Sequence, residues 1–133
     1  MNLTNWRKAG EIASQALNYG KTIIKEGASA LEVANKIESK IRELGGEPAF
    51  PVNLSYNEFA SHWIPKKNEE LIFKDHVVNL DVGVHVEGCI GDCACTIDLS
   101  GKYTKLVESA KEALDEVEKI LSRNINFTKN FCF

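Results

Sequence analysis

The chain has 133 residues, of which 44% are hydrophobic and 26% are charged, and its formal net charge is −3 at pH 7. This length suits one domain, and the composition is that of an ordinary globular protein with an apolar core. The charge balance speaks against a nucleic-acid partner, and no apolar run approaches the length of a membrane span. Without a signal segment, a cytoplasmic protein with no membrane contact is expected.

Two amphipathic helices are predicted in the first third of the chain. Residues 5–25 repeat apolar side chains at intervals of three and four, which is typical of a helix with one buried face. Ser29 and Glu32 form a capping-box pattern at the start of a second helix, which should close at Gly45-Gly46. Both helices are expected to cover one face of a sheet.

An extended segment is predicted over residues 48–65, with short strands at 51–56 and 59–63 and a turn at Asn57-Glu58. His62 lies in the second of these strands. A lone histidine in such a segment is more often structural than functional, and its local pattern does not decide between the two.

The most regular pattern, residues 77–97, predicts a β-hairpin with strict alternation along both arms. The polar face carries Asp81 and Asp92. A loop from His85 to Gly88, or a two-residue loop at Val86-Glu87, would place these two aspartates directly opposite each other, and the four-residue loop is preferred. The other face is apolar, and its cysteines are expected to be reduced thiols; it comprises Val78, Leu80, Val82, Val84, Cys89, Cys93, Cys95 and Ile97.

Two adjacent carboxylates repel each other unless a cation lies between them, and oxygen ligands suit divalent ions. Asp81 and Asp92 therefore have two interpretations: half of a metal site, or two solvated side chains on an exposed sheet face. Aspartate is depleted in strand interiors, which favours the metal site.

A third helix is predicted from Thr104 to Ser122, followed by an irregular tail over residues 123–133. Its apolar stripe has no obvious partner in the chain, and we expect it to favour self-association. The stripe comprises Leu106, Val107, Ala110, Ala113, Leu114, Val117, Ile120 and Leu121.

Three motifs together resemble the second, archaeal type of methionine aminopeptidase over residues 8–121. They are Asn57–Pro65 around His62, Val78–His85 around Asp81, and Gly88–Thr96 around Asp92. The resemblance implies half of a pita-bread fold in residues 1–122: an α+β unit with an antiparallel sheet and helices packed on one face, plus the first helix of the second half. It implies the N-terminal methionine of nascent peptides as substrate.

The same resemblance implies two divalent metal ions (Co, Mn, Fe or Zn) in the complete enzyme. Asp81 would bind one metal, Asp92 would bridge both, and His62 would contact the bound peptide. The family's three further ligands, a histidine and two glutamates, have no match. Every histidine precedes Asp92, and the later glutamates all fall in the predicted third helix.

The chain is therefore expected to be inactive by itself, and no catalytic residue is assigned. The alternative is a non-catalytic half-fold that serves as a binding module or is a gene remnant. A creatinase or prolidase relative is a weaker enzyme alternative, because the motif around His62 fits the aminopeptidase better.

Overall fold

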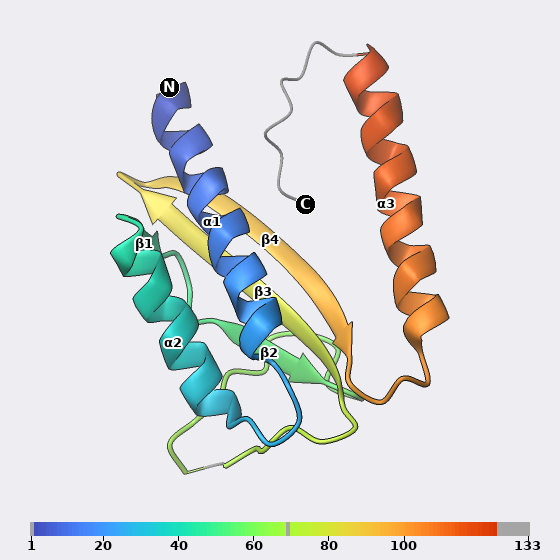
Figure 1. Cartoon of the computed structure of the whole chain (residues 1–133). Helices are drawn as coiled ribbons and strands as arrows, with labels where there is room; N and C mark the ends of the chain where they lie inside the picture. The colour runs from blue at the N-terminus through green and yellow to red at the C-terminus, as the bar shows by residue number, and fades with distance from the viewer. Residues whose placement is uncertain (1, 69, 125–133) are drawn as a thin grey trace.

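The computed structural model describes residues 2–68 and 70–124. Helix α1 (Leu3–Ile23) and helix α2 (Ala30–Glu43) are followed by strands β1 (Glu47–Pro48), β2 (Asn53–Tyr56), β3 (Val77–Val86) and β4 (Cys89–Asp98). Helix α3 (Thr104–Asn124) comes last. Figure 1 shows α1 and α2 side by side on one face of the sheet. The expected α+β architecture, with helices packed on one face of an antiparallel sheet, is confirmed.

Strand β3 is the central strand of the sheet. It pairs antiparallel with β4 along one edge, and with β1 and β2 at successive positions along the other. Because β3 is ten residues long and the two partners on its second edge are short, one continuous strand organises the whole sheet. Both sheet-forming arms predicted over residues 77–97 are present.

Local chemistry sets the ends of α2. The Ser29 hydroxyl accepts a hydrogen bond from the Glu32 amide at 3.5 Å, as the capping pattern predicts. At the other end, the Gly46 amide donates to the Ile41 carbonyl and the Gly45 amide donates to the Arg42 carbonyl. Gly45 has φ +85°, so this closure needs a residue without a side chain, and it turns the chain directly into β1.

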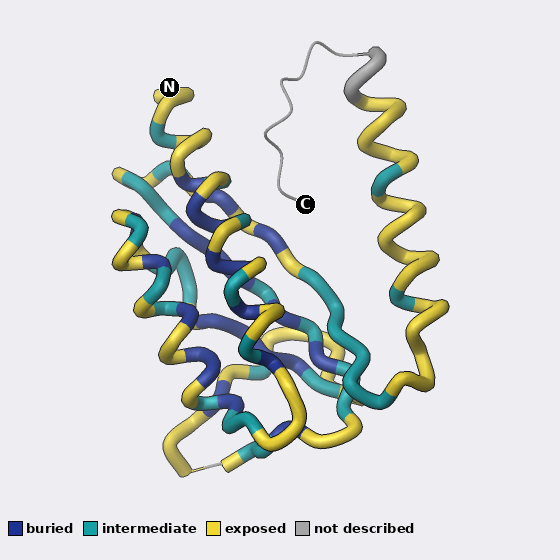
Figure 2. The backbone as a smooth tube through the Cα atoms, in the orientation of Figure 1, coloured by how far each residue is buried: buried dark blue, intermediate teal, exposed yellow. Residues whose placement is uncertain are grey.

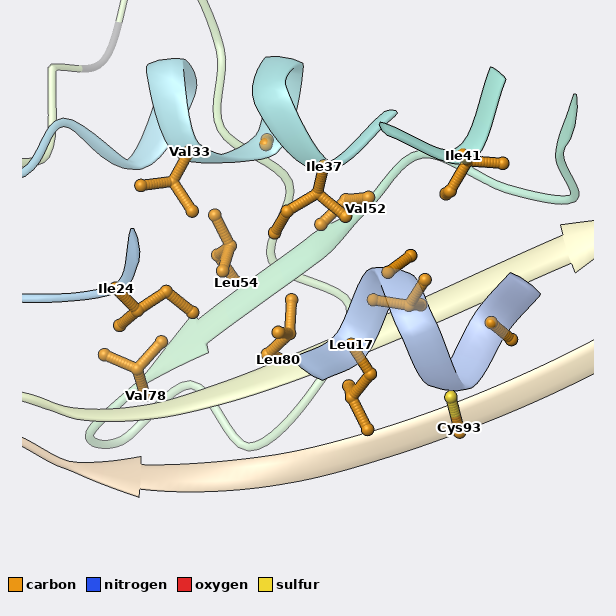
Figure 3. Close-up of a cluster of buried hydrophobic side chains, with 14 of the residues drawn as sticks. Leu17, Ile24, Val33, Ile37, Ile41, Val52, Leu54, Val78, Leu80 and Cys93 are labelled. Atoms are coloured by element: carbon orange, nitrogen blue, oxygen red, sulfur yellow. The ribbon is translucent and has the colours of Figure 1, made fainter. Parts of the chain in front are cut away.

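The core lies between the two helices and the sheet (Figure 3). Leu80 and Val82 of β3 are fully buried beneath α1, and Ile37 of α2 packs into the same cluster. The helices approach closely, because a methyl group built on Gly20 would overlap the side chains of Leu80 and Ile37. The apolar face predicted for the hairpin is therefore the face that forms the core.

The strand predicted at residues 59–63 is wrong. Asn57-Glu58 does form a turn, but the chain beyond it is irregular. His62 has φ +62°, which is incompatible with an extended strand, and so no regular ladder continues through it. In place of a ladder, Trp63 makes two hydrogen bonds with β2, one with the main chain of Leu54 and one with the side chain of Ser55.

Helix α3 stands beside β4 rather than over the sheet, and Figure 2 shows it exposed along most of its length. Leu106 is 68% exposed and Ile120 is 58% exposed, so the predicted apolar stripe is largely uncovered in the described structure. No helix in the described ranges is long and apolar enough to cross a membrane. The tail expected from residue 123 falls outside the described residues, apart from the last two residues of α3.

Candidate functional site

The two aspartates of the hairpin are positioned by a two-residue turn. Glu87 and Gly88 have φ values of +49° and +77°, and Val86 pairs with Cys89. Positive φ at both central residues is the mark of a type I′ turn, whose twist matches that of the flanking strands. The preferred four-residue loop is therefore wrong, because Glu87 adopts the left-handed conformation that was expected only of glycine.

This turn shifts the predicted register by two residues. Asp81 pairs with Ala94, and Asp92 pairs with Gly83, so the two aspartates lie diagonally across the ladder rather than directly opposite. A shift of two keeps every side chain on its predicted face, because the side-chain period of a strand is two. Both carboxylates accordingly share one face of the sheet, and this is the face away from α1 and α2.

The two carboxylates interact directly. Partial burial raises the pKa of Asp81 above its usual value, and the negative charge of Asp92 and a hydrogen bond between the two side chains raise it further. The electrostatic effect of His62 on the pKa of Asp81 acts in the opposite direction. The structure therefore brings together all three residues that the sequence singled out, two from the hairpin and one from the loop after β2.

The loop that carries His62 is fixed by β2. The Leu54 amide donates to the Trp63 carbonyl at 2.9 Å, and the Trp63 amide donates to the Ser55 hydroxyl at 3.1 Å. Tyr56 adds an edge-on aromatic contact with Trp63, with ring centroids 5.1 Å apart. Because β2 also pairs with β3 opposite Asp81, one short strand links the histidine loop to the carboxylate pair.

Phe50 is a residue of this face that the sequence did not single out. A methyl group built on Gly83 would overlap several atoms of the Phe50 ring, so the ring lies directly on the strand at the pair formed by Gly83 and Asp92. The available signal was Gly83 itself. A glycine inside a strand often marks the close approach of another group.

His85 also lies on the carboxylate side of β3. Its Nδ1 atom is buried and has no hydrogen-bond partner among the described residues. The preferred four-residue loop puts His85 in the hairpin loop, whereas the structure places it in the strand, paired with both Glu47 and Ile90.

The donor set suits a hard or borderline divalent cation but is small. Asp81 and Asp92 supply carboxylate oxygens at hydrogen-bonding distance from each other, which is the arrangement that a cation would bridge. No group of three or more metal-binding side chains occurs in the described ranges. The residues present therefore fit one side of a metal centre, with the remaining donors to be supplied from elsewhere.

The cysteines on the other face of the hairpin are packing residues. Cys89 and Cys95 are free thiols, as the sequence predicted, and Cys93 is buried in the core. Burial raises the pKa of the Cys95 thiol, and the charge of Lys21 partly opposes that effect. A protonated thiol is a poor nucleophile and a poor metal ligand, so the environment of Cys95 does not activate it.

Sequence comparison gives matches along most of the chain. It is 49% identical over 120 residues to a methionine aminopeptidase of Methanocaldococcus jannaschii, covering 90% of this chain and 41% of that protein. It is 35% identical to a methionine aminopeptidase of Methanothermus fervidus, covering 93% of this chain and 70% of that protein. The chain thus spans about two fifths of the length of several curated relatives that it matches, such as that of M. jannaschii.

Solved structures show the same architecture. A methionine aminopeptidase of Thermotoga maritima superposes with a TM-score of 0.77 at 25% identity, covering 87% of this chain and 52% of that one. A prolidase of Pyrococcus horikoshii gives a TM-score of 0.71 at 26% identity, over 88% of this chain and 34% of that one. The expected pita-bread relationship is confirmed over part of those folds. Residues 4–130 match the model of metallopeptidase family M24, and the chain belongs to this family.

Proposed function

We propose that this chain carries the half of a methionine aminopeptidase that supplies Asp81, Asp92 and His62, and that it does not cleave peptides by itself. The observation that supports this most is the diagonal carboxylate pair, with His62 beside it on the open face of the sheet. In this proposal Asp81 and Asp92 would hold the divalent ions, with Asp92 shared between two, and His62 would contact the bound peptide. Bound ions of this kind supply a polarised carbonyl and an activated water.

The residues of the chain itself would position the substrate. The Phe50 ring on Gly83 provides an apolar surface beside Asp92, which suits a methionine side chain. The positive φ of His62 and the two hydrogen bonds to Trp63 hold the imidazole near Asp81. Strained backbone of this kind is common where a side chain must be held in one functional position.

The absence of activity follows from the ligand count. Two carboxylates leave each ion short of the four to six donors that such sites use. A loosely held ion is poorly oriented, and orientation is what a preorganised site provides. The chain offers no histidine after Asp92, and its later glutamates, at 108, 112, 116 and 118, all lie on α3.

The test is the release of methionine from a Met-Ala-Ser peptide, with Mn²⁺ or Co²⁺ added to the purified chain. We expect no turnover above that of the Asp81→Asn variant, which serves as the matched control. Turnover that Asp81→Asn abolishes would overturn the inactivity of the isolated chain.

Binding of Mn²⁺ that depends on Asp81 and Asp92, measured by calorimetry, separates this proposal from the non-catalytic alternative, which requires no metal.

Two further parts of the proposal concern the surroundings of the chain. We place it in the cytoplasm, where nascent peptides are available as substrates.

We also propose self-association through the side of α3 formed by Leu106, Val117 and Ile120, which are 68%, 50% and 58% exposed. Light scattering tests this: the mean mass should rise with concentration and should return to that of a monomer in Val117→Lys.

A further inference from the structure

We propose that a second copy of this chain docks face to face on the carboxylate side of the sheet, with two divalent ions held between Asp81, Asp92 and His62 of both copies. This inference rests on the proposed function, because it concerns the same two aspartates. It goes further by naming the source of the donors that one chain lacks, which is the same surface of another copy.

The carboxylate side of β4 is an exposed row of side chains. Side chains on one side of a strand are two residues apart, and on this side of β4 they include Ile90, Asp92 and Ala94. All three are exposed, Ile90 to 60%. Helices α1 and α2 pack on the other side of the sheet (Figure 1), so neither of them covers this row. The half-buried Phe50 ring on Gly83 borders the row and adds apolar surface to it.

One copy can contact an ion from one direction only. Asp81 and Asp92 share one side of the sheet, and the exposed His62 is close enough to act electrostatically on Asp81. Divalent ions of this class use about four to six donors, which surround the ion. A second copy that faces the first would supply the same three side chains from the opposite direction. In a single chain, water would have to occupy those positions.

The spacing of stacked sheets suits such a contact. Two sheets that pack face to face lie about 10 Å apart. Two aspartate side chains and two metal–oxygen bonds of about 2 Å each span roughly this distance. A two-fold axis near Asp92 would also place Ile90 of each copy opposite Ala94 of the other, so that a large apolar side chain meets a small one. The row is therefore complementary to itself.

The charge of the row makes the contact depend on the ions. Each copy brings two carboxylates to the contact, and four negative charges close together repel one another. Two divalent ions balance this charge, whereas one ion would leave half of it uncompensated. The two copies should therefore separate when the ions are removed. Association through α3 depends on apolar surface and should not respond to Mn²⁺ in this way.

The test is the mean mass of the chain, measured by light scattering with Mn²⁺ and with EDTA. Every sample carries Val117→Lys, which is designed to remove the association through α3. We expect Mn²⁺ to double the mean mass, EDTA to restore the mass of a monomer, and Asp92→Asn to abolish the response. Calorimetric titration should give about one Mn²⁺ per chain, with an apparent affinity that rises with chain concentration because binding is coupled to association.

Two matched substitutions separate the carboxylate side of β4 from α3. Ile90→Gln and Leu106→Gln each replace an exposed apolar side chain with a neutral polar one, at positions that are 60% and 68% exposed. In the presence of Mn²⁺, Ile90→Gln should lower the association constant about tenfold, because both copies lose the apolar contact. Leu106→Gln should leave it unchanged, and circular dichroism checks the fold of each variant.

The outcomes distinguish this inference from the proposed function. Mn²⁺ that binds through Asp81 and Asp92 to a chain of monomer mass would overturn the face-to-face pair and leave the proposed metal site intact. A Mn²⁺-dependent dimer that persists in Asp92→Asn, or that Ile90→Gln does not weaken, would also overturn the pair, because the copies would then meet at another surface. Absence of any Mn²⁺ binding that depends on the two aspartates would overturn both proposals.

Discussion

Asp81 and Asp92 leave adjacent strands on the same face of the sheet, but each is paired with a small residue, Asp81 with Ala94 and Asp92 with Gly83. This diagonal arrangement keeps the carboxylates close enough to hydrogen-bond, and the Phe50 ring lies on the strand at the pair formed by Gly83 and Asp92. Directly opposite aspartates would crowd each other at the shortest cross-strand distance. The offset therefore separates the two carboxylates by more than a direct cross-strand pair would, while both still face the same side of the sheet.

Without metal, Asp81→Asn should stabilise the fold at neutral pH. The pKa of Asp81 is raised in the folded state, so the folded protein binds that proton more tightly than the unfolded chain. Stability contributed by the protonated group is present at low pH and is lost as the pH rises from 3.8 through the folded pKa. Thermal unfolding in EDTA at pH 4 to 8 should show the variant a few degrees above the wild type at pH 7, with the difference vanishing at pH 4.

The control for this measurement is Asp75→Asn. Asp75 forms an exposed ion pair with Lys102, and such pairs contribute little to stability. A wild type that is more stable than Asp81→Asn at pH 7 would contradict the carboxylate repulsion inferred from the structure.

Added Mn²⁺ should reverse that order of stability. A ligand that binds only the folded chain stabilises it by about 1.4 kcal/mol at ten times its dissociation constant. We expect the wild type to gain thermal stability with Mn²⁺ and to lose the gain in EDTA, while Asp81→Asn and Asp92→Asn gain little. The same gain in Glu108→Gln, which lies on α3 away from the pair, would show that the effect is specific to the two aspartates.

Gly91→Ala should destabilise the protein by about 1–3 kcal/mol, the usual cost of overpacking. A methyl group built on Gly91 would lie 2.6 Å from the main-chain carbonyl carbon of Ala9 and the amide nitrogen of Gly10. Backbone of a helix cannot move aside as a flexible side chain can, so α1 would have to shift as a whole. Urea unfolding measures the loss, and Ala94→Ser on the exposed face of the same strand should change stability by less than about 0.5 kcal/mol.

Asp98→Ala should loosen α3. The Asp98 carboxylate accepts hydrogen bonds from the Ser100 amide and hydroxyl, the Gly101 amide, the Tyr103 amide and the Thr104 hydroxyl. These bonds, led by that from the Ser100 hydroxyl, lower the pKa of Asp98. Hydrogen exchange at the start of α3 should accelerate in the variant.

The lowered pKa of Asp98 determines how the stability of the start of α3 changes with pH. A lowered pKa means that the stabilisation is fully present above 3.8 and is lost as the pH falls through the folded pKa. In the wild type, the protection of the amides in the first turns of α3, measured against the intrinsic exchange rate at each pH, should therefore decrease only below about pH 4. Unchanged protection in Asp98→Ala at pH 7 would show that another contact holds the helix.

Local patterns of the sequence predict much of the fold. The hydroxyl of Ser29 caps α2 as its spacing indicates, and the alternation from Val78 to Ile97 identifies the buried face of the hairpin correctly. The cap depends on residues that are close in the sequence. The buried face depends on an alternation of period two, which is the same whichever residues pair across the strands. They can therefore be read before any tertiary contact is known.

The register and the histidine loop could not be predicted in this way. A register shift of two residues changes the cross-strand partner of Asp81 from Asp92 to Ala94. Every side chain stays on the same face of the sheet, so the alternation of apolar and polar residues cannot detect the shift. The conformations that decide both features are left-handed ones at Glu87 and His62, and residues other than glycine adopt them in only a small fraction of cases. Tertiary contacts stabilise such conformations, and a single sequence does not reveal them.

The turn at Glu87 and Gly88 sets the register and also keeps the contacts of the hairpin local in sequence. It pairs residues between 3 and 21 positions apart, and hairpins of this kind form within about 1–10 μs. The contact of Gly91 with Ala9 closes a loop of about eighty residues, which forms more slowly because its closure entropy is larger. The spacing of the two carboxylates therefore depends on contacts that are local in sequence, whereas burial of the other face of the hairpin requires the closure of the longer loop.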